Sequence, residues 1–161
     1  MIALLAVGWL TLLIAAPRLP VVLAAVLYAA GSLICHQIPE RSFHLDAFQL
    51  PVCARCLGLY AGGAVGSLGA ALAGMGRTCA PSRSLRKGLL YAATLLAALP
   101  TVASVVVEWI AGWPVSNVAR ATAGLPLGFV LGLVVIGMGT RDEERRTKNV
   151  AKPPDSAVLR S

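Results

Sequence analysis

The chain has 161 residues, of which 57% are hydrophobic and only 13% are charged, and its mean hydropathy is +0.76. Soluble domains carry about 25% charged residues, so this composition excludes an ordinary water-soluble enzyme and also a disordered protein. The net charge of +7 is not arranged as a basic stripe among aromatic residues, so we expect no nucleic-acid partner. We therefore expect an integral membrane protein whose first partner is the lipid bilayer.

Five apolar runs predict transmembrane helices. A spanning helix needs about 20 predominantly apolar residues, and runs without an ionisable side chain reach this length at 57–76, 89–107 and 121–140. Two shorter apolar runs, at 1–16 and 21–35, flank Arg18 and its neighbouring prolines. Proline interrupts a helix and a buried arginine is costly, so we predict a helical hairpin with a tight turn here. The predicted fold class is an all-α integral membrane protein with a bundle of about five transmembrane helices.

The positive charges predict the orientation of this bundle. With five spans, most of the 14 Lys and Arg residues fall on the side that holds the C-terminus, whereas Arg41, Arg55 and Arg120 fall on the other side. The positive-inside rule then places the C-terminus in the cytoplasm and the N-terminus outside, in the cytoplasmic (inner) membrane of a prokaryote. We divide the chain into one polytopic membrane domain at 1–140 and a basic, disordered cytoplasmic tail at 141–161.

Small residues recur every four positions in two of the predicted spans. The rows are Gly58, Gly62, Gly66, Ala70 and Gly74 in the third span and Gly124, Gly128 and Gly132 in the fifth. Such GxxxG rows let helix backbones approach closely within a bilayer, so we expect these two helices to touch. The spacing does not say whether the touching helices belong to one chain or to two. A homo-oligomer formed through these faces is therefore the second possibility.

The reactive side chains are concentrated in the extracytoplasmic loop between the second and third spans, which is rich in cysteine and histidine. Cys53 and Cys56 form a C-x-x-C motif at the start of a helix, where free backbone N–H groups stabilise a thiolate. Together with Cys35 and His36 they complete the thiolate and imidazole set that zinc prefers, so we predict a Zn²⁺ site. If one of the adjacent residues Cys35 and His36 does not reach the metal, His44 or water fills the gap.

Two other functions fit the same cysteines. In a membrane thiol-disulfide oxidoreductase, Cys53 and Cys56 exchange electrons with a periplasmic or quinone partner, Cys35 acts as a relay and His36 as a base. In a non-catalytic interaction subunit, a structural disulfide fixes the loop and the partner is another membrane protein. The sequence does not decide whether the protein is an enzyme. The fourth cysteine, Cys79, falls on the cytoplasmic side, and we interpret it as a free thiol.

Further polar residues fall at the same membrane face as the cysteines. Glu108 ends the fourth span and Arg120 precedes the fifth, so the two either reach separately toward the interface or form a pair. A pair would hold the loop down or orient a ligating histidine. The supporting polar residues are Gln37, Glu40, Arg41, His44, Arg55, Glu108, Asn117 and Arg120.

Three stretches of the chain carry a resemblance to a known family. They are CHQIPERSF at 35–43, QLPVCARCLGLYAGG at 49–63 and SNVARATAGLPLG at 116–128. Their pattern resembles a family of small prokaryotic membrane proteins known as domain of unknown function 2085, and the match runs from the second span to the fifth. The resemblance implies a membrane protein and supports the location of the site, but it implies no activity, substrate or cofactor.

Overall fold

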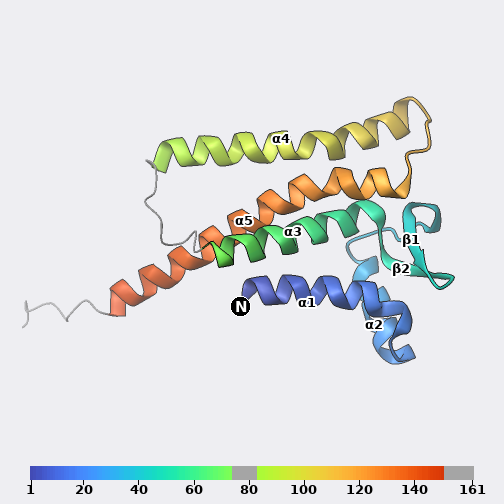
Figure 1. Cartoon of the computed structure of the whole chain (residues 1–161), viewed down its shortest axis with the longest axis horizontal. Helices are drawn as coiled ribbons and strands as arrows, with labels where there is room; N and C mark the ends of the chain where they lie inside the picture. The colour runs from blue at the N-terminus through green and yellow to red at the C-terminus, as the bar shows by residue number, and fades with distance from the viewer. Residues whose placement is uncertain (74–82, 151–161) are drawn as a thin grey trace, which may run out of the picture.

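The structure is a computed structural model that describes residues 1–73 and 83–150. The chain is mostly helical, as predicted, and Figure 1 shows α1, α3, α4 and α5 running alongside one another. The smaller elements gather at one end of this bundle. In chain order the elements are α1 (Ile2–Ala15), η1 (Ala16–Arg18), α2 (Val21–Ser32), η2 (Pro39–Arg41), β1 (Ser42–Leu45), β2 (Phe48–Cys53), α3 (Ala54–Leu72), α4 (Arg83–Ile110) and α5 (Asn117–Val150).

Two helices in the described part of the chain are long and apolar enough to cross a membrane. They are Gly88–Ile110 and Asn117–Gly139, each 23 residues long with a mean hydropathy of 2.0. The α3 helix is shorter and is diluted by glycines, and the apolar segments Ile2–Arg18 and Val21–Ser32 are shorter still. Length and composition therefore support two of the five predicted spans. Because α5 continues to Val150, beyond the predicted end of the last span, the division of the chain at residue 140 stays a prediction.

The segment between α2 and α3 is not a plain loop, so the all-α prediction is wrong in this detail. Strands β1 and β2 pair antiparallel, with His44 opposite Gln49, and the turn between them contains Asp46 and Ala47. Both turn residues have positive φ, at 51° and 69°, as the tight turns favoured by right-twisted hairpins require. The hairpin ends at Cys53, which is also the N-cap of α3. It therefore delivers the C-x-x-C motif directly from a strand into a helix.

The first two helices do not form the predicted hairpin of two spans. The turn at Pro17 and Pro20 is present, but α2 packs against β2 and η1 instead of running back along α1. A helix of 12 residues is only about 18 Å long, too short to cross a bilayer. In contrast, α1 packs along α3, and the Trp9 and Tyr60 rings meet edge to face with centroids 6.4 Å apart.

The small elements and the N-terminus lie at opposite ends of the bundle. We call the end formed by α2, β1, β2, the starts of α3 and α5 and the end of α4 the hairpin end (Figure 1). The N-terminus lies at the opposite end. The Ile2 side chain there packs against Gly139, late in α5, where a Cβ would lie 3.1 Å from Ile2 Cδ1. The N-terminus and the late part of α5 thus lie at the same end of the bundle, and their placement relative to a membrane stays a prediction.

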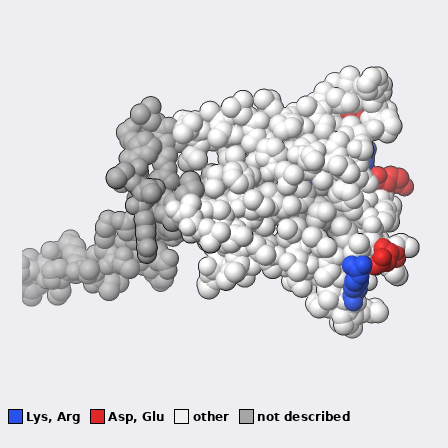
Figure 2. Space-filling view, in the orientation of Figure 1, with Lys and Arg blue, Asp and Glu red and all other residues white. Residues whose placement is uncertain are grey.

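Within residues 1–73 and 88–139, charged side chains are confined to the hairpin end. Figure 2 shows them gathered at one end of the molecule, beside a broad uncharged surface. Within residues 1–73 and 88–139, the Lys, Arg, Asp and Glu residues are Arg18, Glu40, Arg41, Asp46, Arg55, Glu108 and Arg120. An uncharged band along four packed helices is typical of a bundle whose middle faces hydrocarbon.

The predicted contact between the two glycine-rich helices is confirmed within the single chain. Each row of glycines faces backbone carbonyls of the other helix so closely that a Cβ would overlap them. In α3 the pairs are Gly58 with Ala121, Gly62 with Leu125, and Gly66 with Phe129; in α5 they are Gly124 with Arg55, Gly128 with Leu59, and Gly132 with Gly63. Gly74 lies outside the described residues. The two rows thus pack against each other within one chain, and the homo-oligomer through these faces stays a prediction.

Substitution of Gly62 by alanine tests this contact. A Cβ there would meet the Leu125 carbonyl, so the two helices must separate, and we expect Gly62→Ala to lower the free energy of unfolding by about 1–3 kcal/mol. The matched control is Gly69→Ala in the same helix, where a Cβ meets nothing within 4 Å. Alanine favours a helix by up to about 1 kcal/mol, so this variant should be neutral or stabilised. Thermal unfolding in detergent measures both, and equal stabilities would contradict the contact.

Candidate metal and thiol site

Three cysteines from three different elements meet at the hairpin end. Cys35 follows the last turn of α2, Cys53 ends β2, and Cys56 lies in the first turn of α3. Their Sγ atoms all lie within 4.8 Å of one another, and all three are free thiols. Cys35 is buried, and its sulfur accepts a hydrogen bond of 3.2 Å from the backbone N–H of Cys53. The structure therefore joins Cys35 to the C-x-x-C motif, as the sequence predicted.

Gln37 holds the cysteine-bearing segment after α2 against the hairpin. Its Nε2 atom donates to the carbonyl oxygens of Tyr28, at 2.8 Å, and Pro51, at 2.7 Å. The backbone carbonyl of Gln37 accepts a hydrogen bond of 2.6 Å from the Nε2 atom of Gln49. Gln37 has a φ of 50°, a left-handed conformation that is uncommon for residues other than glycine. Gly31 completes this contact, because a Cβ there would overlap the Pro51 carbonyl.

Ser42 and Asn117 connect the hairpin to α5. Ser42 is fully buried, and its hydroxyl donates to the Ile38 carbonyl at 2.9 Å. The Asn117 amide donates to the Ser42 carbonyl, also at 2.9 Å, across 75 residues of sequence. Asn117 was predicted as a supporting residue, whereas Ser42 was not singled out. A serine in a polar loop carries no signal of burial, which only the packed hairpin reveals.

Glu108 is the centre of a buried group of charges. Its side chain is 5% exposed, and its two oxygens face Arg120 at 2.6 Å, Arg55 at 2.9 Å and Arg41 at 4.0 Å. The predicted pair with Arg120 is present, so the alternative that Glu108 reaches separately into the interface is wrong. One carboxylate against three guanidinium groups leaves a local excess of positive charge. The group joins η2, α3, α4 and α5 at one point.

Two of the three arginines are held by further hydrogen bonds. Arg55 donates through Nε to the Ser104 hydroxyl at 3.0 Å and through Nη2 to the Ser104 carbonyl at 3.1 Å. Arg120 donates through Nη1 to Asn117 Oδ1 at 2.6 Å and to the Glu40 carbonyl at 3.3 Å. Ser104 was missed in the sequence. Ser104 lies four residues before Glu108, on the same face of α4. This spacing was the sequence feature that could have predicted its place beside Glu108.

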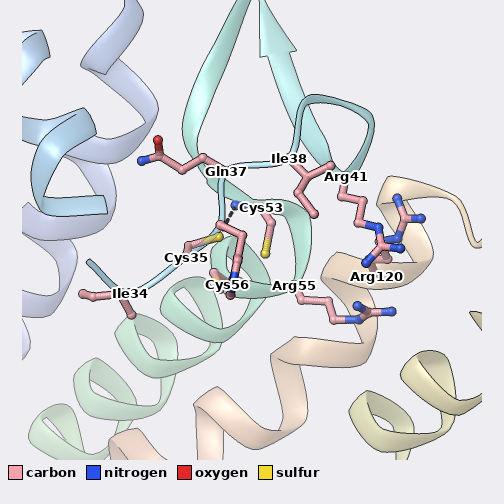
Figure 3. Close-up of a pocket in the computed structure, with 10 residues that line it drawn as sticks. Ile34, Cys35, Gln37, Ile38, Arg41, Cys53, Arg55, Cys56 and Arg120 are labelled. Atoms are coloured by element: carbon pink, nitrogen blue, oxygen red, sulfur yellow. Dashed lines mark hydrogen bonds between the residues drawn. The ribbon is translucent and has the colours of Figure 1, made fainter. Parts of the chain in front are cut away.

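A cavity of about 210 Å³ separates the cysteines from the arginines. In Figure 3 the cysteine side chains lie on one side of it, while Arg41, Arg55 and Arg120 approach from the other. Its lining residues are Ile34, Cys35, His36, Gln37, Ile38, Arg41, Cys53, Arg55, Cys56 and Arg120. Thiols and guanidinium groups therefore share one solvent-accessible space.

The two histidines lie differently from the cysteines. His36 is exposed and lines the cavity, but it does not belong to the group of ligand atoms within 4.8 Å. His44 is exposed on β1, opposite Gln49, and does not line the cavity. Ligation by a histidine thus stays a prediction. Cys79, interpreted as a free cytoplasmic thiol, lies outside the described residues.

The surroundings of Cys53 favour its thiolate. A hydrogen bond from the Cys56 side chain lowers the pKa of Cys53 to about 5, against the opposing effect of burial. The backbone N–H groups of Cys56 and Arg55, at the start of α3, act in the same direction. Such a pKa makes Cys53 a thiolate at neutral pH, which is the form that binds metals and attacks disulfides.

The pH dependence of Cys53 alkylation tests the low pKa of this thiol. In metal-free protein the Cys53 thiolate persists above its pKa, so the iodoacetamide rate should stay nearly constant from pH 8 to 6 and fall by half near pH 5. Cys56→Ala removes the main stabilising hydrogen bond, and its Cys53 rate should already fall about tenfold per pH unit below pH 8. Mass spectrometry of the Cys53 peptide measures the rate. A tenfold loss between pH 7 and 6 in the unaltered protein would contradict the low pKa.

Comparisons with known proteins identify a family and name no activity. The family model described as "Predicted membrane protein (DUF2085)" matches residues 35–134, more than half of the chain. An uncharacterised protein of Methanocaldococcus jannaschii is 55% identical over 42 residues, which are 26% of this chain and 27% of the relative's length. An uncharacterised protein of Methanothermobacter thermautotrophicus is 35% identical over 103 residues, 64% of this chain and 83% of that relative. No solved structure matches the chain.

Proposed function

Because the chain belongs to the DUF2085 family of predicted membrane proteins, we propose that it is a multi-pass protein of the prokaryotic cytoplasmic membrane with a metal site at its outer end. The observation that carries the proposal is the group formed by Cys35, Cys53 and Cys56, whose sulfurs lie within 4.8 Å of one another. Zinc is the proposed metal, since it combines readily with thiolates in a four-coordinate site.

The dimensions and charge of the site fit this metal. Zinc–sulfur bonds of about 2.3 Å place tetrahedral thiolates about 3.8 Å apart, so the three sulfurs need to approach by at most about 1 Å. Three thiolates around a divalent ion carry one net negative charge, which the excess of arginine charge around Glu108 offsets. The fourth position is open to His36, which lines the cavity, or to water.

Metal analysis of the purified protein tests the site. We expect about one zinc per chain in the unaltered protein and none after Cys53→Ser with Cys56→Ser, because two of three thiolates are lost. The matched control is Cys79→Ser, since most of α3 separates Cys56 from Cys79 in the sequence. It should retain the metal. Unaltered protein that contains no metal, even after incubation with Zn²⁺, would sink the proposal.

The low pKa of Cys53 favours a second candidate function, that of a membrane thiol-disulfide oxidoreductase. In this reaction the Cys53 thiolate attacks a disulfide of a periplasmic partner and forms a mixed disulfide. Cys56 then displaces the second partner sulfur, so the partner gains two electrons and the protein is left with a Cys53–Cys56 disulfide. A metal-free protein with a reversibly reducible Cys53–Cys56 bond would favour this function over the metal site.

We further propose that α1, α3, α4 and α5 cross the membrane, with the hairpin end outside. Of the 14 Lys and Arg residues, Arg18, Arg41, Arg55 and Arg120 lie at the hairpin end, and the others fall within 77–87 and 141–160. These two basic segments follow α3 or the predicted last span, so the positive-inside rule favours the cytoplasm for the opposite end. Exposed Trp109 and Trp113 beside the hairpin end fit an interfacial aromatic belt.

Reporter fusions test this topology. A protein with four crossings has both termini in the cytoplasm, whereas five crossings would separate them. We expect fluorescent protein fused to either terminus to fluoresce in a bacterial host, and alkaline phosphatase fused to either terminus to be inactive. Active phosphatase at the N-terminus would restore the five-span topology. Labelling of Cys79 from outside the cell by an impermeant maleimide would overturn the orientation altogether.

A further inference from the structure

We propose that the cavity beside the three cysteines binds a phosphate-type oxyanion through the guanidinium group of Arg41. This inference goes beyond the metal site, because it rests on the arginines and not on the cysteines. The ligand class follows from the charge, the free hydrogen-bond donors and the size of the cavity.

The arginines leave the cavity with an unbalanced positive charge. Glu108 is the carboxylate that they share, and it already faces Arg120 at 2.6 Å and Arg55 at 2.9 Å. None of the residues that line the cavity carries a carboxylate, and the Cys53 thiolate offsets only one of the two excess positive charges. Glu40, the nearest acidic residue along the chain, is exposed to solvent and does not line it. An excess of positive charge lining a partly enclosed cavity attracts an anion.

Arg41 is the arginine with donors to spare. The side chains of Arg55 and Arg120 each donate two or more hydrogen bonds to protein groups. The Arg41 guanidinium approaches Glu108 only to 4.0 Å and donates no hydrogen bond to another described residue. Its side chain is 40% exposed and lines the cavity. A guanidinium group presents paired N–H donors that match two oxygens of a phosphate. Arg41 can thus take up an oxyanion without breaking an existing hydrogen bond.

Two helix starts and the cavity volume favour the same ligand. Arg55 and Arg120 lie in the first turns of α3 and α5, so the positive ends of both helix dipoles are directed to this region. Water occupies about 30 Å³ per molecule, so about 210 Å³ holds a tetrahedral oxyanion with part of its hydration. Exposed Ile34 and Ile38 border the same space. The phosphate group can therefore come from a free ion or from a lipid headgroup.

Thermal unfolding in the presence of stated anions tests the proposal. Purified protein in detergent is titrated with inorganic phosphate against sodium chloride of equal ionic strength. In a second arm, the protein is placed in nanodiscs of phosphatidylcholine, with or without phosphatidylglycerol. We expect phosphate or phosphatidylglycerol to raise the unfolding midpoint with saturation, and Arg41→Gln to weaken the apparent affinity at least tenfold.

The matched control is Arg18→Gln, which removes another arginine of the hairpin end. The Arg18 side chain is 59% exposed, pairs with Asp46 and does not line the cavity. It should respond as the unaltered protein does. A response to phosphate in detergent assigns the site to the free ion, and a response to phosphatidylglycerol alone assigns it to a headgroup. The proposal is overturned if neither probe raises the midpoint, if chloride acts equally, or if Arg41→Gln responds normally. Should Arg41→Gln not fold, Arg41→Lys must show the loss, because it keeps the charge without the paired donors.

Discussion

The close approach of α3 and α5 places most of the functional groups. Glycines on each helix lie against carbonyls of the other, so the two backbones can meet in only a narrow range of registers. Both helices begin at the hairpin end, and this register brings Arg55, in the first turn of α3, close to Arg120, in the first turn of α5. The same start of α3 carries Cys53 and Cys56. A helix contact made of the smallest residues thus sets the spacing between the thiols and the arginines.

The buried charges at Glu108 explain how this end is kept in one arrangement. Charges removed from water are costly unless they are paired and hydrogen-bonded. Arg55 and Arg120 meet that condition through Ser104, Asn117 and backbone carbonyls as well as through Glu108. The remaining positive charge has no carboxylate of its own. It therefore faces the cavity, where thiolates or an external anion supply the opposite sign.

The hairpin end contains elements that a simple bundle of membrane helices lacks. A short α2 and the β1–β2 hairpin fold over the starts of α3 and α5, and Gln37 ties them together through three hydrogen bonds. This arrangement buries Cys35 next to the N-cap of α3. It also places the N-terminus at the end opposite the cysteines. The elements that build the site are therefore the same ones that depart from the predicted helical bundle.

The sequence by itself determined the class of the protein, the long helices, the contact between the glycine rows and the position of the cysteines. These features follow from composition, from runs of apolar residues and from spacing along one helix, all of which are local. Only the tertiary structure decided that α2 packs against β2, that residues 42–53 form a hairpin, and that Glu108 meets three arginines. It also separated Cys35, which joins the other thiols, from His36, which does not. The reason is physical, because the direction of a short helix and the partners of a buried charge depend on packing between segments far apart in the chain.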